Sequence, residues 1–168
     1  MKRGLWLLLV AWAVSLPALA ENVRGVVVGV IDGDTVLFKP ERTGARSRAI
    51  LKIRLADIDA PEKSQAYGDA ATRALTALVL NQSVEANMVA TDVYGRRVAH
   101  LAQGTLQVNI EMVRLGLAWT YYPASRYRRN AAGVAAQEEA RRARRGLWAE
   151  ATPTPPWIWR RAQRQSVN

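Results

Sequence analysis

The stretch IRLADIDAPE, residues 53–62, joins a strand pattern to an acidic turn. Apolar residues occupy alternate positions of residues 49–56, which is typical of a half-buried β-strand. Pro61 then fixes its own φ and pushes the residue before it towards an extended conformation. The sequence therefore predicts a strand that runs directly into a rigid turn rich in carboxylates.

This turn has the chemistry of a site for a hard cation. Asp59, the carbonyl of Ala60 and Glu62 can surround one point, and the repulsion between the two carboxylates must then be offset by a positive group. Ca²⁺ takes oxygen ligands at about 2.3–2.6 Å and would supply that charge. A solvated acidic turn without any ligand is the alternative interpretation.

A second acidic stretch, VIDGDTV, covers residues 30–36. Its Asp-Gly pair is typical of a tight hairpin turn. If the strand instead continued through it, Asp32 and Asp34 would share a face, with a bulge at Gly33. An EF-hand loop is excluded, because apolar residues occupy the positions of its later ligands.

Arginines stand beside both acidic regions. Arg54 lies on the strand before the turn, and Arg96 closes a third stretch, TDVYGR, at residues 91–96. Guanidinium groups hold phosphate oxygens bidentately. In a chain with so many arginines, ordinary surface charge is the alternative for each of them.

The rest of the chain alternates strand and helix patterns, which indicates an α+β fold. Residues 152–159 (TPTPPWIW) are too rich in proline for a helix, so we expect an extended tail that leaves the domain. The other predicted elements are strands within 23–38, at 83–90 and at 97–101, and helices at 69–80, 108–117 and 131–145.

Composition narrows the chemistry. The chain carries a formal charge of +10, one histidine and no cysteine. Thiolate metal sites, thiol catalysis and histidine triads are therefore excluded, and carboxylate chemistry remains. The positive charge fits nucleic acid, anionic lipid or an acidic polymer, and by itself it does not choose among them.

The first 20 residues have the features of a signal peptide. A basic start at Lys2 and Arg3 precedes an apolar run, and Ala18-Leu19-Ala20 is a small-x-small cleavage site. We expect cleavage near Ala20 and a periplasmic or extracellular mature chain. That chain should be a monomer without stable membrane association. An uncleaved membrane anchor is the alternative.

The ordered set of stretches resembles the staphylococcal nuclease (thermonuclease) family. The resemblance covers residues 23–150 and rests on VIDGDT, IRLADIDAPE, QAYGDAA, TDVYGR, VRLGLAW and RRGLW, in this order. It implies a domain over residues 21–150, folded as a five-stranded OB-fold β-barrel with about three packed helices. Residues 151–168 would form a Pro/Trp/Arg-rich C-terminal tail.

The resemblance also implies an activity, a Ca²⁺-dependent endonuclease acting on DNA and/or RNA and leaving 5′-hydroxyl and 3′-phosphate ends. Tyr94 and one of Tyr121 or Tyr122 are candidates to face the nucleotide. The implied roles are Asp34, Asp59 and the Ala60 backbone carbonyl as metal ligands, Glu62 as general base, and Arg54 and Arg96 as phosphate contacts.

Two other classes of protein compete with the enzyme. A catalytically silent OB-fold could bind single strands through positive charge and base stacking. Acidic groups in the groove oppose this interpretation, because they add nothing to the binding of a polyanion. A basic protein that holds an anionic envelope polymer would fit the arginine-rich tail, but it leaves the three acidic and basic stretches unexplained.

Overall fold

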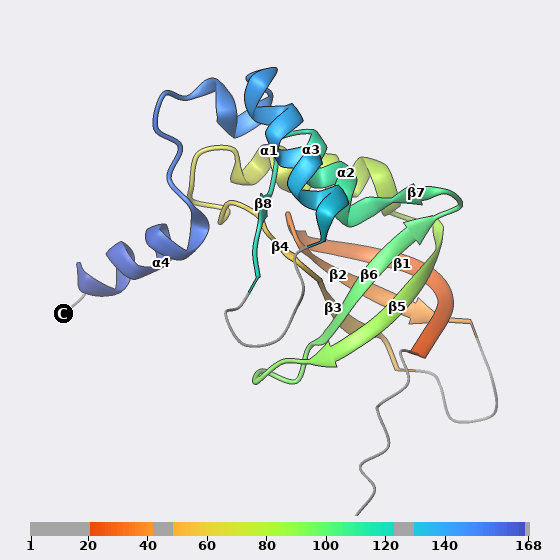
Figure 1. Cartoon of the computed structure of the whole chain (residues 1–168). Helices are drawn as coiled ribbons and strands as arrows, with labels where there is room; N and C mark the ends of the chain where they lie inside the picture. The colour runs from red at the N-terminus through yellow and green to blue at the C-terminus, as the bar shows by residue number, and fades with distance from the viewer. Residues whose placement is uncertain (1–20, 42–48, 123–129, 167–168) are drawn as a thin grey trace, which may run out of the picture.

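The strands close into a barrel in the computed structural model, which describes residues 21–41, 49–122 and 130–166 (Figure 1). The sheet has the order β3-β2-β1-β5-β6-β7, and a parallel pairing of β3 with β6 closes five of these strands on themselves. The predicted five-stranded OB-fold barrel is thus confirmed. The strands are β1 (Glu21–Asp32), β2 (Thr35–Pro40), β3 (Leu51–Leu55), β5 (Ser83–Thr91), β6 (Arg97–Gln103) and β7 (Leu106–Gln107).

Helices cover one end of the barrel (Figure 1). Helix α1 packs against β1, and α2 packs between β6 and α3. A short pair, β4 (Ile58–Asp59) and β8 (Trp119–Thr120), lies between barrel and helices. The helical segments are α1 (Gly68–Val79), α2 (Val108–Arg114), α3 (Ala131–Arg142), the 3₁₀ turn η1 (Gly146–Ala149) and α4 (Pro156–Gln165).

The barrel core is made by side chains from alternate strand positions and from the inner faces of α1 and α2. The alternation predicted for residues 49–56 is confirmed, because Ile53 and Leu55 are buried, Lys52 before them is exposed and Arg54 between them is partly exposed. The largest fully buried side chains are Phe38, Ile53, Leu55, Leu75, Leu101 and Met112. The core thereby anchors both ends of the acidic turn.

The C-terminal tail differs from the prediction. Residues 156–165 form helix α4, not an extended tail, and the described part of the chain therefore holds four α-helices where about three were expected. Pro156 occupies the first turn, where its missing N–H costs no hydrogen bond. The prolines of the TPTPP stretch thus precede or start a helix, and they do not interrupt one.

The predicted signal peptide lies outside the described ranges, because these begin at residue 21. Among the described helices, none is long and apolar enough to cross a membrane.

Candidate active site

Asp34 sits in the tight turn between β1 and β2. Its N–H donates to Asp32 Oδ1 at 3.0 Å, as expected for an Asp-Gly turn. A β-carbon added at Gly33 would lie 2.6 Å from the β-carbon of Ala71 and 2.7 Å from that of Ala60. Only glycine permits this close packing against α1 and the acidic turn. The turn is thus confirmed, and the two register shifts of β1 against β2 lie between Val27 and Gly29 and between Val30 and Asp32, not at Gly33.

The acidic turn brings Asp59 to the same place. Strand β4 pairs Asp59 with Trp119 of β8 and buries its side chain completely. The N–H of the next residue, Ala60, donates to Asp34 Oδ2 at 3.2 Å. Two carboxylates that are 25 residues apart in the sequence therefore meet beneath the barrel surface.

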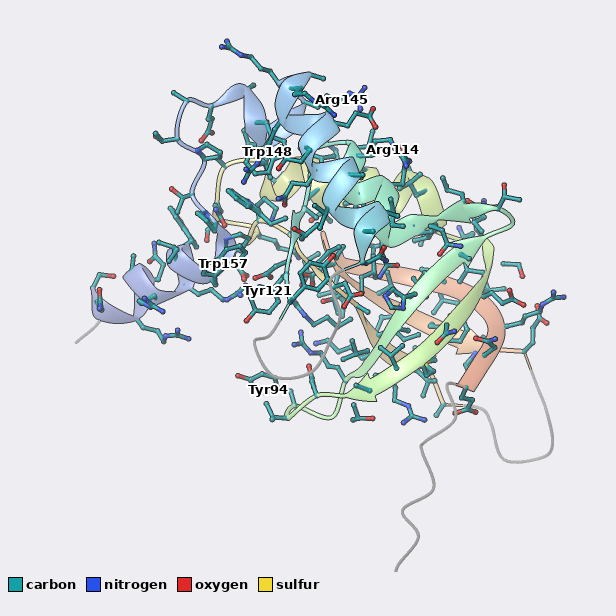
Figure 2. The ribbon with its side chains drawn as sticks, viewed as in Figure 1. Tyr94, Arg114, Tyr121, Arg145, Trp148 and Trp157 are labelled. Carbon is teal, nitrogen blue, oxygen red and sulfur yellow. The ribbon has the colours of Figure 1, made fainter. Side chains whose placement is uncertain are left out.

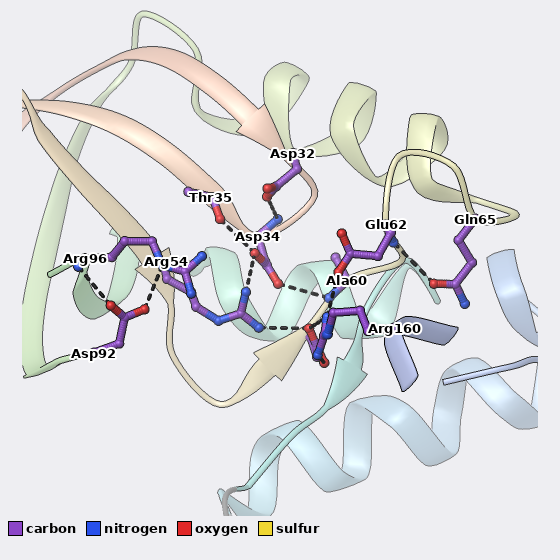
Figure 3. A network of polar contacts seen from close by, with 11 residues as sticks. Asp32, Asp34, Thr35, Arg54, Ala60, Glu62, Gln65, Asp92, Arg96 and Arg160 are labelled. Carbon is purple, nitrogen blue, oxygen red and sulfur yellow. Dashed lines mark hydrogen bonds and ion pairs between the residues drawn. The ribbon is translucent and has the colours of Figure 1, made fainter. Parts of the chain in front are cut away.

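Arg54 joins the two carboxylates (Figure 3). Its Nη1 donates to Asp34 Oδ1 at 2.9 Å and its Nη2 to Asp59 Oδ1 at 2.8 Å. Arg54 comes from β3, where it is paired with Thr35 of β2, the residue directly after Asp34. The strand register therefore sets the position of the guanidinium.

Charge in this cluster is only partly balanced. Burial raises the pKa of Asp34 to about 7, against the lowering effect of Arg54. Burial alone would lower the pKa of Arg54, but Asp34 and Asp59 together raise it. The cost of burying the Asp34 charge thus exceeds its attraction to one arginine, so the cluster would be stabilised by a further cation.

Glu62 lies at the rim of the cluster. Its side chain is 42% exposed, so its carboxylate reaches solvent. Gln65 fixes its backbone: the Glu62 N–H donates to Gln65 Oε1 at 3.3 Å, and the Glu62 carbonyl accepts from the Gln65 N–H at 2.8 Å. An acid held in this way can contact water at the site.

Arg96 is held by a different partner. Its Nε donates to Asp92 Oδ2 at 2.6 Å, and its backbone N–H donates to Asp92 Oδ1 at 2.9 Å. Partial burial raises the pKa of Asp92, but hydrogen bonds from Arg96 and Tyr94 outweigh this effect and lower it. Since β6 runs beside β3, this turn adjoins Arg54, as Figure 3 shows.

Arg160 was not predicted as a site residue. From α4 it donates to Asp59 twice, Nη2 to Oδ2 at 2.6 Å and Nη1 to Oδ1 at 3.1 Å, and to Glu62 Oε1 at 2.7 Å. The hydrogen bond to Asp59 raises the pKa of Arg160 further. The three-residue spacing of Trp157 and Arg160 fits one face of a helix, but it does not indicate a contact with Asp59.

The candidate tyrosines occupy separate places. Tyr94 is 81% exposed at the tip of the β5–β6 hairpin. The ring of Tyr121 lies 5.4 Å from that of Trp157, while the Tyr122 hydroxyl donates to the Asn130 carbonyl at 3.2 Å (Figure 2 labels Tyr94, Tyr121 and Trp157). Which of these tyrosines faces a bound nucleotide stays a prediction.

Known proteins are similar in sequence to this chain over most of its length. The family model described as staphylococcal nuclease homologue matches residues 52–150. The chain belongs to the staphylococcal nuclease family. An uncharacterized endonuclease of Escherichia coli O157:H7 is 40% identical over 153 residues, which is 90% of this chain and 94% of that protein. A micrococcal nuclease of Shigella flexneri is 37% identical over 165 residues, covering 92% and 90% of the two chains.

Some of the candidate site residues lie inside the segment that the family model matches, and others lie outside it. Arg54, Asp59, Glu62 and Arg96 fall inside residues 52–150. Asp34 precedes that segment, and Arg160 lies beyond its end. The structure nevertheless brings Arg54, Asp34, Asp59 and Arg160 into one hydrogen-bonded cluster.

The donor set suits a hard cation, but it is small. Asp34 and Asp59 offer oxygens only, and one guanidinium spans both carboxylates. Within the described residues, no three acidic or histidine side chains converge closely enough to hold an ion by themselves. Because Ca²⁺ takes 6–8 oxygen ligands, the Ala60 carbonyl, water and a substrate phosphate would have to complete the shell. Ligand type and charge therefore fit Ca²⁺.

Proposed function

We propose that this chain is a Ca²⁺-dependent endonuclease that hydrolyses DNA and/or RNA to 5′-hydroxyl and 3′-phosphate ends. The observation that carries the proposal is the bridge from Arg54 to two buried carboxylates, Asp34 and Asp59. A surface built only to bind a polyanion gains nothing from buried acids. Relatives named endonuclease and micrococcal nuclease support the cleavage of nucleic acid.

Asp34, Asp59 and the carbonyl of Ala60 would hold the metal. When bound, Ca²⁺ would act as a Lewis acid on a phosphate oxygen. Family membership and the oxygen-only donor set support this role.

Arg54 is suited to bind the phosphate group during attack. It is always protonated, and two of its five N–H donors fix its plane against Asp34 and Asp59, which leaves three donors for a phosphate. Preorganised donors of this kind stabilise charge as it develops on the phosphate oxygens, without reorganising at that moment. The proposed contribution of Arg54 to catalysis therefore depends on its fixed orientation as much as on its charge.

Arg96 can offer donors to the same phosphate. Asp92 takes only the Nε–H and the backbone N–H of Arg96. The two terminal nitrogens of Arg96 make no further hydrogen bond within the described residues, so they remain available to an anion. Asp92 thus orients Arg96 without using the part of the guanidinium that a phosphate needs.

Glu62 would orient or deprotonate the attacking water. Its backbone is fixed by Gln65 and its carboxylate reaches solvent, so it can accept a proton from water at the rim of the site. A general base must lie within hydrogen-bond reach of the proton that it removes.

Cleavage of a defined DNA and a defined RNA by the purified protein tests this function. We expect cleavage with Ca²⁺, none in excess chelator, and products whose 3′ ends carry phosphate by end-group analysis. Full activity in chelator would contradict the role of the metal. Products with 5′-phosphate ends would contradict the proposed direction of bond cleavage.

We further propose that the protein is exported and acts as a monomer. The basic start, apolar run and small-x-small site of residues 1–20 support export. Sequencing the N-terminus of the processed protein should find Glu21, and a retained Met1 on a membrane-bound product would contradict the proposal.

A further inference from the structure

Helix α4 lies over the candidate active site although it is remote in sequence. Arg160 is 101 residues beyond Asp59, and its guanidinium contacts both oxygens of that carboxylate as well as Glu62. Only 34% of the Arg160 side chain is exposed. The contact is therefore a specific, partly buried ion pair and not a passing surface charge.

Other contacts hold the helix in place. Gln65 Nε2 donates to the Thr154 carbonyl at 2.5 Å just before α4. The ring of Trp157 lies 5.4 Å from that of Tyr121 and 5.7 Å from that of Trp119. Farther along the helix, Arg161 and Arg164 are exposed. The helix is thus anchored by its aromatic face, and that face directs Arg160 to the acids.

The oxygens that Arg160 uses are those that the proposed function assigns to the metal. Asp59 Oδ1 accepts from both Arg54 and Arg160, and Asp59 Oδ2 accepts from Arg160 at 2.6 Å. Arg54 contacts only Oδ1 of Asp59 and leaves Oδ2 open to a metal, whereas Arg160 takes Oδ2 as well. A dication beside Oδ2 would be repelled by the Arg160 guanidinium. Arg160 and Ca²⁺ are therefore competitors for one position.

We propose that α4 is an intramolecular latch: Arg160 closes the active site by taking Asp59 and Glu62, and it leaves them when Ca²⁺ binds. This inference rests on the proposed function and adds its regulation. The apparent association constant for Ca²⁺ is then the intrinsic constant multiplied by the fraction of molecules in which the latch is open. It also makes metal binding and the release of α4 one coupled equilibrium. The matched family segment ends at residue 150, before the latch begins.

Calcium titration of the purified full chain by calorimetry, without nucleic acid, tests the latch. Arg160→Gln should bind Ca²⁺ about tenfold more tightly than the wild type, as expected if roughly nine in ten molecules are closed. Arg161→Gln is the matched control. It removes the same charge from an exposed neighbour that makes no contact with the acids, so its affinity should stay within about twofold.

A second variant loosens the helix and keeps Arg160. Trp157→Ala removes the ring that lies against Tyr121 and Trp119, so it should also tighten Ca²⁺ binding, though less than Arg160→Gln does. It also provides an independent test if Arg160→Gln does not fold.

The outcomes separate the latch from the function on which it rests. Equal or weaker Ca²⁺ affinity in Arg160→Gln and in Trp157→Ala would overturn the latch, even if the wild type cleaves nucleic acid normally. Tighter binding in both variants without cleavage by any form would support the latch and overturn the nuclease. A wild type and variants that all fail to bind Ca²⁺ would overturn both.

Discussion

Arg54 and Arg96 were predicted as an equivalent pair, and the structure holds them in different ways. Arg54 leaves a barrel strand and is fixed by two buried carboxylates from two other elements. Arg96 closes a hairpin turn and is fixed by one half-buried acid four residues earlier. The first arrangement depends on the whole barrel, and the second depends on one turn.

The difference shows that two arginines near one site can be held with different rigidity. Burial and register orient Arg54 permanently, at the cost of burying the charge of Asp34. Asp92 holds the Nε of Arg96, and the terminal nitrogens of Arg96 make no further hydrogen bond within the part of the chain that the structure describes. We therefore expect changes at the Arg54 cluster to have large effects, and changes at the Arg96 turn to have graded ones.

The largest effect should follow Asp34→Asn. Losing a proposed metal ligand and one partner of Arg54 should lower the cleavage rate at least about 10³-fold, comparable to the loss of a preorganised catalytic group. In chelator the melting temperature of the same variant should stay within about 5 °C of the wild type, because losing a charge that burial disfavours is offset by losing an acceptor for Arg54 or the Ala60 N–H.

Asp69→Asn is the matched control for this variant, because Asp69 is exposed in the first turn of α1. Its cleavage rate and melting temperature should stay close to those of the wild type. A large fall in the melting temperature of Asp34→Asn would show instead that this carboxylate is structural.

An intermediate effect is expected for Arg96→Lys. Lysine keeps the charge but loses the Nε–H that Asp92 accepts and the two-nitrogen fork. Single-turnover cleavage should slow by roughly 10–10²-fold, with melting unchanged. A loss as large as that of Asp34→Asn would remove the distinction between the two regions.

Asp92→Asn should have the smallest effect, a few-fold slower cleavage at neutral pH, because only the orientation of Arg96 is relaxed. The hydrogen bonds lower the pKa of Asp92, so its contribution to stability is present above the ordinary carboxyl pKa and is lost as pH falls through the lowered value. Thermal melts of wild type and variant should therefore converge at acid pH. A difference that stays constant across this pH range would contradict the ion pair.

Local patterns predicted most of this fold. The strand alternation of residues 49–56 and the helical period of residues 69–80 were correct within one or two residues, because each element buries one face against the core. The Asp-Gly turn at Asp34 was also predictable. The proximity of Asp34 to Asp59 depends on the closed barrel. The barrel was predicted from the family resemblance and not from the periodicity of the sequence.

Contacts between distant segments could not be predicted from the sequence. Nothing within residues 152–159 indicates that α4 folds back on Asp59, since that placement depends on Trp119 and Tyr121 meeting Trp157 in three dimensions. The pairing of Arg96 with Asp92 is local, and their four-residue spacing across a turn could have suggested it. Sequence reasoning therefore singled out the two carboxylates and Arg54, which the structure brings together, but it did not single out Arg160.

Single-turnover cleavage and nucleic-acid affinity of Arg54→Lys, measured on one preparation at saturating Ca²⁺, test the central claim most directly. If the buried fork acts on charge that develops during the reaction, the rate should fall by roughly 10²–10³-fold while affinity changes by only a few-fold. A near-normal rate, with the loss confined to affinity, would show that Arg54 is an ordinary phosphate contact and that the bridged carboxylates are not a catalytic centre.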